Sequence, residues 1–118
     1  MLRDKKSSCL ADVEKRAARS KLFEIPSREE REDLWPGDLA KLVFERVSGI
    51  GERLWVRVMN VMGEGLYVGA VESSPLYDDL HRGDEVIFEA KNVAGITRNC
   101  VPGFDRPFRK QKQKAILQ

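Results

Sequence analysis

Apolar and polar positions alternate with a period of two in four segments, 38–47, 52–61, 66–72 and 84–89. Successive side chains of a strand point to opposite faces, so this period predicts β-strands. The β-branched and aromatic content of the segments favours the same structure. The residues expected to face inward together are Leu42, Phe44, Leu54, Val56, Val58, Val68, Val86 and Phe88.

The connections between these segments limit how the strands are arranged. Glycine-containing turns at 48–51 and 63–65 are short, so the first three strands are expected to form an antiparallel meander. The longer stretch 73–83 is expected to be a crossing loop. The sequence therefore predicts an α+β fold: a strongly bent antiparallel sheet of four to five strands, of which a partly open small barrel is one form, with one or two helices on one face.

Two helices and one helical turn are expected outside the strands. Apolar residues recur at helical spacing between residues 8 and 21, although the apolar stripe is thin. Ser27 and Glu30 have the spacing of a capping box, and Pro36 requires that helix to be short. Residues 90–93 are expected to form one helical turn.

The 118 residues fit one domain, with a β-rich core at about 36–96. Hydrophobic residues make up 42% and charged residues 34% of the chain, and no apolar run approaches the length of a membrane span. The basic start is not followed by the apolar run of a secretory signal, so a cytoplasmic protein is expected. The ends, 1–7 and 107–118, are expected to be mobile.

Charge is distributed unevenly along the chain. Residues 1–21 carry a net charge of +4, residues 22–97 carry −7, and residues 98–118 carry +5. The tail at 106–114 mixes basic residues with Phe108, which is compatible with nucleic-acid binding. The simpler interpretation is that both ends are solvated and maintain solubility.

No pattern in the sequence indicates catalysis. His81, Cys9 and Cys100 each lack a neighbouring group that would complete a catalytic pair or a zinc site. No glycine-rich phosphate-binding motif occurs. We therefore expect no enzymatic activity, no cofactor and no metal.

The pair Gly-Asp occurs twice directly before a strand, at 37–38 and at 83–84. Two aspartates could form a carboxylate pair for acid/base or metal chemistry. The favoured interpretation is two strand-entry turns, in which glycine permits a positive φ and aspartate accepts from amides two residues further on.

Six residues are candidates for an interaction surface. Trp55 and Arg57 share one face of a predicted strand, and Tyr67 is expected to join them from the next strand. Such a cluster could be an exposed binding platform for a protein or a nucleic-acid base. The favoured alternative is that a helix covers Trp55 through Leu34 or Trp35. Asp78, Asp79 and Glu85 are the acidic residues that would meet a basic partner.

An ordered set of short motifs carries a family resemblance. Residues 52–58 (ERLWVRV), 67–69 (YVG), Pro75 and 83–88 (GDEVIF), preceded by 36–45 (PGDLAKLVFE), resemble the YegJ-like proteins, a bacterial family of unknown function. The match spans about 36–96. The resemblance implies a small cytoplasmic bacterial α+β domain, with a distant similarity to immunity proteins of toxin systems, and it carries over no catalytic or ligand residues.

These observations favour a non-enzymatic protein-interaction module, in the manner of an immunity protein, that binds a protein partner of unknown identity. The alternative is a nucleic-acid-binding module that uses its basic termini. The third class of function is an enzyme whose active site has too few characteristic residues to be recognised in the sequence. The oligomeric state is not predicted.

Overall fold

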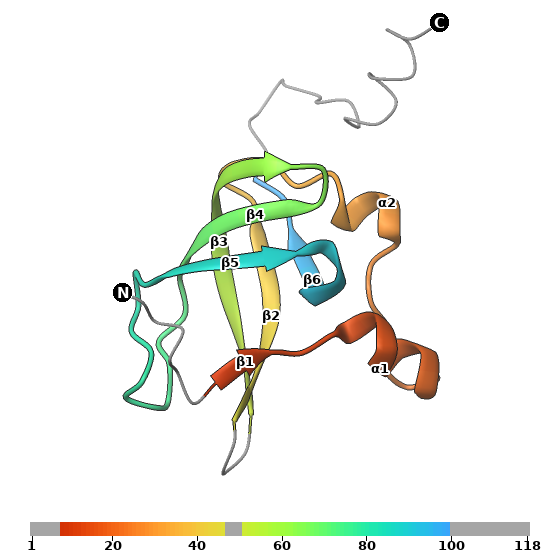
Figure 1. The fold of residues 1–118 in the computed structure, drawn as a ribbon, viewed down its shortest axis with the longest axis horizontal. Coiled ribbons are helices and arrows are strands. Elements are labelled where there is room, and N and C mark those ends of the chain that lie inside the picture. Colours follow the sequence, from red (N-terminus) through yellow and green to blue (C-terminus); the bar gives the residue numbers. More distant parts are fainter. Residues whose placement is uncertain (1–7, 47–50, 100–118) are drawn as a thin grey trace, which may run out of the picture.

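The computed structural model of the chain describes residues 8–46 and 51–99. Figure 1 shows two short helices beside a strongly curved antiparallel sheet. In chain order the elements are β1 (Ser8–Leu10), α1 (Val13–Arg19), α2 (Arg28–Arg31), β2 (Leu39–Arg46), β3 (Glu52–Gly63), β4 (Leu66–Val71), β5 (Glu85–Glu89), the 3-10 turn η2 (Ala90–Asn92) and β6 (Val93–Thr97).

Strands β2 to β5 form an antiparallel meander, and two further strands share the outer edge of β2. β6 returns to pair with the first half of β2, where Leu39 lies opposite Thr97. β1 pairs with the second half, where Phe44 lies opposite Leu10. The sheet is therefore nearly closed and barrel-like, and it has six strands among the described residues rather than the four to five expected.

The main core fills the inside of this sheet. Six of the eight residues expected to be inward are buried, and Val86 is half-buried and packs against them. The four alternating segments are confirmed as β2, β3, β4 and β5. Val68 is the exception, because it lies half-exposed on the outer face.

The face assignment of β4 was wrong, and its pairing with β3 shows why. The inward residues Val56 and Val58 lie opposite Val71 and Gly69, so the odd-numbered residues of β4 face inward. Tyr67 belongs to this set and is fully buried. Gly69 also faces inward, and a Cβ there would approach Val56 to 2.5 Å, so this position has no room for a side chain.

Tyr67 connects the core to the segment after α2. Its hydroxyl donates to the carbonyl of Arg31 (2.8 Å) and accepts from the amide of Leu34 (3.3 Å). Its ring lies 5.3 Å from the ring of Phe88. The tyrosine expected on the outer surface therefore fixes one end of the barrel from inside.

The helices are shorter than their sequence patterns indicate. The capping box at α2 is confirmed: Ser27 Oγ accepts from the Glu30 amide (3.1 Å), and Glu30 Oε1 accepts from the Ser27 amide (3.0 Å). The helix expected from residue 8 begins only after Asp12, whose carboxylate caps it. Residues 8–10 form β1 instead, because Leu10 packs against the core beside Phe44.

Both Gly-Asp pairs are strand-entry turns, as expected. Gly37 and Gly83 have φ values of 99° and 94°, in the region that favours glycine. The side chains of Asp38 and Asp84 bond differently from the expectation: each accepts from the amide three residues earlier, at 2.9 Å. Each carboxylate therefore closes its own turn instead of bonding into the strand that follows.

No helix in the described part of the chain is long and apolar enough to cross a membrane.

Candidate interaction surface

The outer face of the sheet has a covered half and an open half. Over β2, Val43 points outward and is only 4% exposed, because Ala11 and Val13 pack on it, with Phe23 and Ile25 beside them. Figure 1 shows both helices to the right of the sheet, and neither lies in front of β4 and β5. The face formed by β3, β4 and β5 is therefore the uncovered half.

The strand register arranges this uncovered half in rows. Arg57, Ala70 and Glu85 lie side by side on β3, β4 and β5, and Asn60, Val68 and Ile87 form the next row. Leu66 and Glu89 lie in the third row, beside the β3–β4 turn. We call this surface the open face; it consists of Arg57, Met59, Asn60, Met62, Leu66, Val68, Ala70, Glu85, Ile87 and Glu89.

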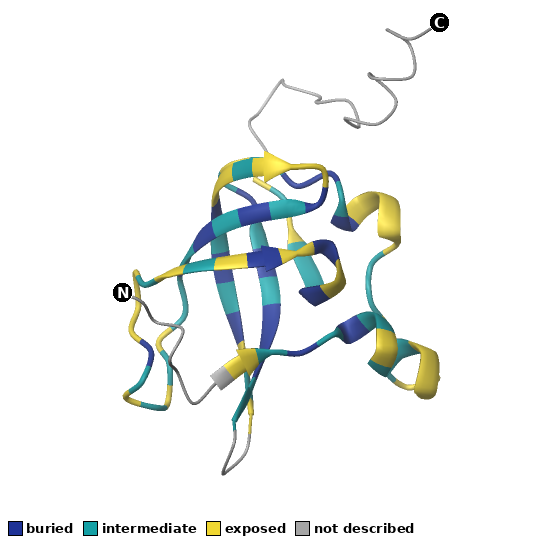
Figure 2. Ribbon diagram, viewed as in Figure 1, coloured by how far each residue is buried: buried dark blue, intermediate teal, exposed yellow. Residues whose placement is uncertain are grey.

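The open face is apolar at its centre and charged at its corners. Ile87 is 66% exposed, and Met59 and Met62 are 54% and 56% exposed. All three outward residues of β4 are apolar and half-buried. Figure 2 shows the exposed positions of β5 alternating with a half-buried and a buried one. Exposed apolar side chains surrounded by charged ones are typical of a binding surface.

Arg57 occupies one corner and is paired within the chain. Its Nε and Nη2 donate to Glu72 at 3.2 Å and 2.7 Å. These hydrogen bonds hold the pKa of Glu72 below its ordinary value, and the charges of Arg57 and Arg82 act in the same direction. The pair is partly exposed, so it defines the border of the open face more than it stabilises the fold.

Trp55 lies on the same side of β3 as Arg57 and is half-buried. Lys41, its cross-strand neighbour, places its ammonium 5.5 Å from the centre of the ring. Leu34, one of the residues expected to cover Trp55, lies in the main core instead. The cover that the structure shows is therefore a lysine from the neighbouring strand.

The six predicted surface residues are only partly brought together. Arg57 and Glu85 share a row, and Trp55 is adjacent on β3. Tyr67 is inside the barrel. Asp78 is exposed on the loop before β5, outside the open face, and Asp79 is occupied by an ion pair.

That ion pair belongs to a network that the sequence analysis missed. Arg46, whose side chain is 3% exposed, donates to Asp79 at 2.6 Å and to Glu52 at 2.8 Å. Its guanidinium lies 4.2 Å from the ring centre of Tyr77, and Glu52 also accepts from the Leu76 amide at 3.1 Å. The network fixes the β4–β5 loop to the β2–β3 hairpin. No local pattern indicates it, because Asp79 and Tyr77 are far from Arg46 in the sequence.

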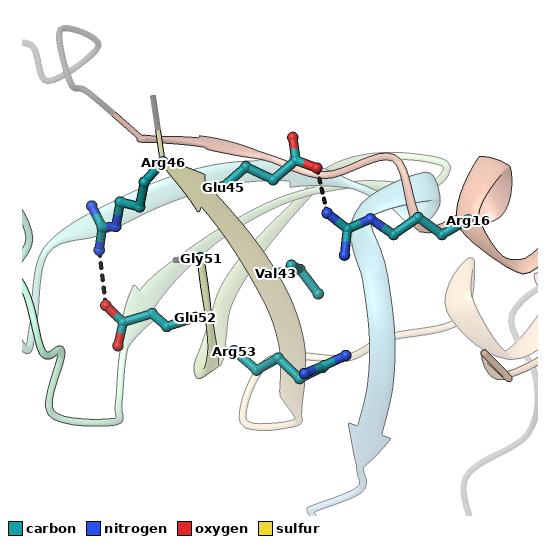
Figure 3. Close-up of a pocket in the computed structure, with 7 residues that line it drawn as sticks. All are labelled: Arg16, Val43, Glu45, Arg46, Gly51, Glu52 and Arg53. Carbon is teal, nitrogen blue, oxygen red and sulfur yellow. Dashed lines mark hydrogen bonds and ion pairs between the residues drawn. The ribbon is translucent and has the colours of Figure 1, made fainter. Parts of the chain in front are cut away.

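A hollow of about 440 Å³ lies beside this network (Figure 3). It is lined by Arg16, Val43, Glu45, Arg46, Gly51, Glu52 and Arg53. Glu45 is paired with Arg16, and Glu52 is paired with Arg46. Each carboxylate of the hollow is therefore directed at an arginine and not at the other carboxylate (Figure 3).

A second hollow, of about 270 Å³, adjoins the open face at Leu66 and Glu89. Four glutamates line it, with Arg28 and Lys91 as the only basic residues of its described lining. Arg28 pairs with Glu14 and Glu32, and Arg31 also pairs with Glu14. The four glutamates still outnumber the two basic residues of the lining, so the hollow carries a small excess of negative charge, which suits a basic partner.

The other residues considered for chemistry lie apart. The side chain of His81 is 73% exposed, and its Nδ1 is 3.9 Å from Asp84. Cys9 is an exposed free thiol, and Cys100 lies outside the described residues. In the described part of the chain no three metal-binding side chains gather. The basic tail at 106–114 also lies outside it.

No family model matches the chain, and neither a similar curated protein nor a similar solved structure was found. The resemblance to YegJ-like proteins stays a prediction.

Proposed function

We propose that this chain is a non-enzymatic protein-interaction module and that it binds a protein partner through the open face. The observation that carries the proposal is the exposure of Ile87, in a row with Val68, at the centre of a sheet face that no described helix covers. The proposed setting is the cytoplasm of a bacterium, in line with the resemblance to YegJ-like proteins.

The comparison with the covered half supports this proposal. On β2 the outward Val43 is buried by the segment around α1, whereas on β5 the outward Ile87 remains in contact with water. Burial of apolar surface is favourable by about 25 cal/mol per Å², so a partner that covers Ile87, Met59 and Met62 gains free energy the isolated chain does not. Charged residues at the corners would restrict which partners fit.

The charge of the surface favours a basic partner. Glu85 and Glu89 flank Ile87, and the glutamate-lined hollow adjoins them. Complementary charge steers association and excludes partners of like charge. An immunity protein that neutralises a basic toxin would use such a surface, and this is the biological role we favour.

The alternative function is nucleic-acid binding through the basic ends. Its support is the charge distribution of the sequence, +4 at residues 1–21 and +5 at 98–118. Carboxylates on the open face would repel phosphate, so this function would use a different surface.

Photo-crosslinking in native cells tests the proposed function. A photoreactive amino acid at position 87 should give a discrete crosslinked protein, identified by mass spectrometry and then confirmed with the purified partner. Leu22, which is 96% exposed but lies outside the open face, is the matched control position. The proposal is wrong if position 87 gives no product, or gives the same products as position 22.

A titration with a generic DNA duplex at two salt concentrations tests the alternative. Phosphate-mediated binding should lose about 0.9 log units of affinity per log unit of salt for each phosphate neutralised. Micromolar binding near physiological salt that disappears when residues 106–118 are deleted would favour nucleic acid over a protein partner.

A further inference from the structure

Strand β5 is one end of the sheet order among the described strands, and its backbone directions can be assigned. The Val71 amide donates to the carbonyl of Asp84, and the Ala90 amide donates to the carbonyl of Gly65, both at 2.9 Å. Even-numbered residues of this stretch therefore direct their backbone groups toward β4. Because these directions alternate along a strand, Glu85, Ile87 and Glu89 direct theirs away from β4.

Only the last of the three outward amides of this edge is used within the chain. The Glu89 amide donates to the side-chain oxygen of Asn92 at 2.9 Å. Across residues 8–46 and 51–99 the amides of Glu85 and Ile87 donate to no other group. The amide and carbonyl groups of Glu85 and Ile87 are therefore in position to form hydrogen bonds with another strand.

The same residues also carry the exposed side chains of β5. Glu85, Ile87 and Glu89 all point outward, and Ile87 is 66% exposed. Within the described residues Glu85 takes part in no ion pair, and Glu89 has only a distant one, with Lys91 at 4.0 Å. An incoming strand would therefore meet the pattern acidic, apolar, acidic at alternate positions.

We propose that the edge of β5 accepts an extended segment of the partner protein as an additional antiparallel strand. That segment would carry an apolar residue opposite Ile87 and a lysine or arginine two positions away on either side, opposite Glu85 and Glu89. Main-chain hydrogen bonds would hold the segment, and the alternate side chains would select it. This inference rests on the proposed function and specifies the chemistry of its partner.

A second copy of this chain does not fit the same edge. Antiparallel pairing of two β5 strands about Ile87 would place Glu85 of one copy opposite Glu89 of the other, and parallel pairing would place each glutamate opposite itself. Like charges directly opposite each other destabilise a strand pair. The two glutamates therefore disfavour self-association and favour a basic segment.

Three capped peptides and the full-length chain test this inference at low ionic strength. The first has Lys-Thr-Ile-Thr-Lys at its centre, the second replaces both lysines by glutamate, and the third replaces isoleucine by serine. Amide exchange measured by NMR should slow about tenfold or more at Glu85 and Ile87 when the first peptide is saturating. The other two peptides should bind at least about threefold more weakly.

Charge reversal provides a matched pair of variants. Glu85→Lys should weaken binding of the lysine peptide about threefold and should improve binding of the glutamate peptide, because one exposed charge pair is removed and another is formed. Glu24→Lys reverses an exposed glutamate outside the open face and should change neither affinity. Unchanged folding of both variants is checked by their spectra.

Several results would overturn the inference. Equal binding of all three peptides would exclude the proposed selection. Peptide binding without slower exchange at Ile87 would exclude pairing along the edge. Slow exchange at Ile87 before peptide is added would mean that the edge is already occupied, by the chain itself or by a second copy. A crosslink at position 87 in cells together with any of these results would leave the proposed function intact and remove only the strand pairing.

Discussion

The covered and the open halves of the outer sheet face start from similar side chains and end in different environments. Val43 on β2 and Val68 on β4 both point outward, yet Val43 is 4% exposed and Val68 is half-exposed. The difference comes from the segment around α1, which places Ala11 and Val13 on Val43. An outward apolar residue is therefore a core residue in one half and a surface residue in the other, and the following variants test that distinction.

The largest expected effect concerns two neighbours on β5. Phe88→Ala should lower the free energy of unfolding by about 3–5 kcal/mol, because Phe88 is buried against Tyr67. Ile87→Ala should change it by no more than about 0.5 kcal/mol, because Ile87 is exposed. Urea denaturation of both variants measures the difference. Equal losses would mean that the open face is covered in solution.

The next effect concerns the loop that leads into the open half. Arg46→Met removes the arginine that pairs with Glu52 and Asp79 in a largely buried network and should lower the free energy of unfolding by about 3 kcal/mol. Arg57→Met, at the exposed pair with Glu72, is the control and should cost much less. Thermal unfolding followed by circular dichroism measures the difference in melting temperature between the two variants. Similar melting temperatures would contradict the burial of the Arg46 network.

The comparison itself is tested by one substitution made in each half. Val43→Ala should cost about 1–3 kcal/mol, because it leaves a cavity under the segment around α1. Val68→Ala, on the open face, should cost less than half as much, because its side chain is already partly in water. A reversed order, measured by chemical denaturation, would mean that the two halves have been assigned incorrectly.

The smallest expected effect is a pH dependence at the border of the open face. Arg57 lowers the pKa of Glu72, so the pair contributes stability above the ordinary carboxyl pKa and loses it as the pH falls through the lowered value. The melting temperature of Glu72→Gln should therefore lie below that of the wild type at neutral pH and converge with it in acid. A constant difference at all pH values would show that the ion pair is not responsible.

The sequence allowed the four central strands to be predicted because a period of two survives in each. It did not allow β1 and β6 to be predicted, because their contacts are with β2, far away in sequence. A three-residue strand such as β1 is also too short to show a period.

The face of β4 could not be predicted because both of its faces are apolar. Leu66, Val68 and Ala70 alternate with Tyr67, Gly69 and Val71, so composition does not distinguish inside from outside. The pairing of Val56 with Val71 and of Val58 with Gly69 decides which residues of β4 face inward. Of the residues predicted for an interaction surface, Arg57 and Glu85 lie on the open face, whereas Ile87, Met59 and Met62 were not among the candidates.

The three partners of β2 have a consequence for the order of folding. The β2–β3 pair joins neighbouring segments, so its closure costs little chain entropy, whereas β6 must return to β2 from the far end of the described chain. Contacts between distant segments form slowly. We therefore expect the β2–β3 hairpin to be structured in the folding transition state and the β2–β6 pair to form late. Substitutions in β6 should then accelerate unfolding while leaving the folding rate nearly unchanged.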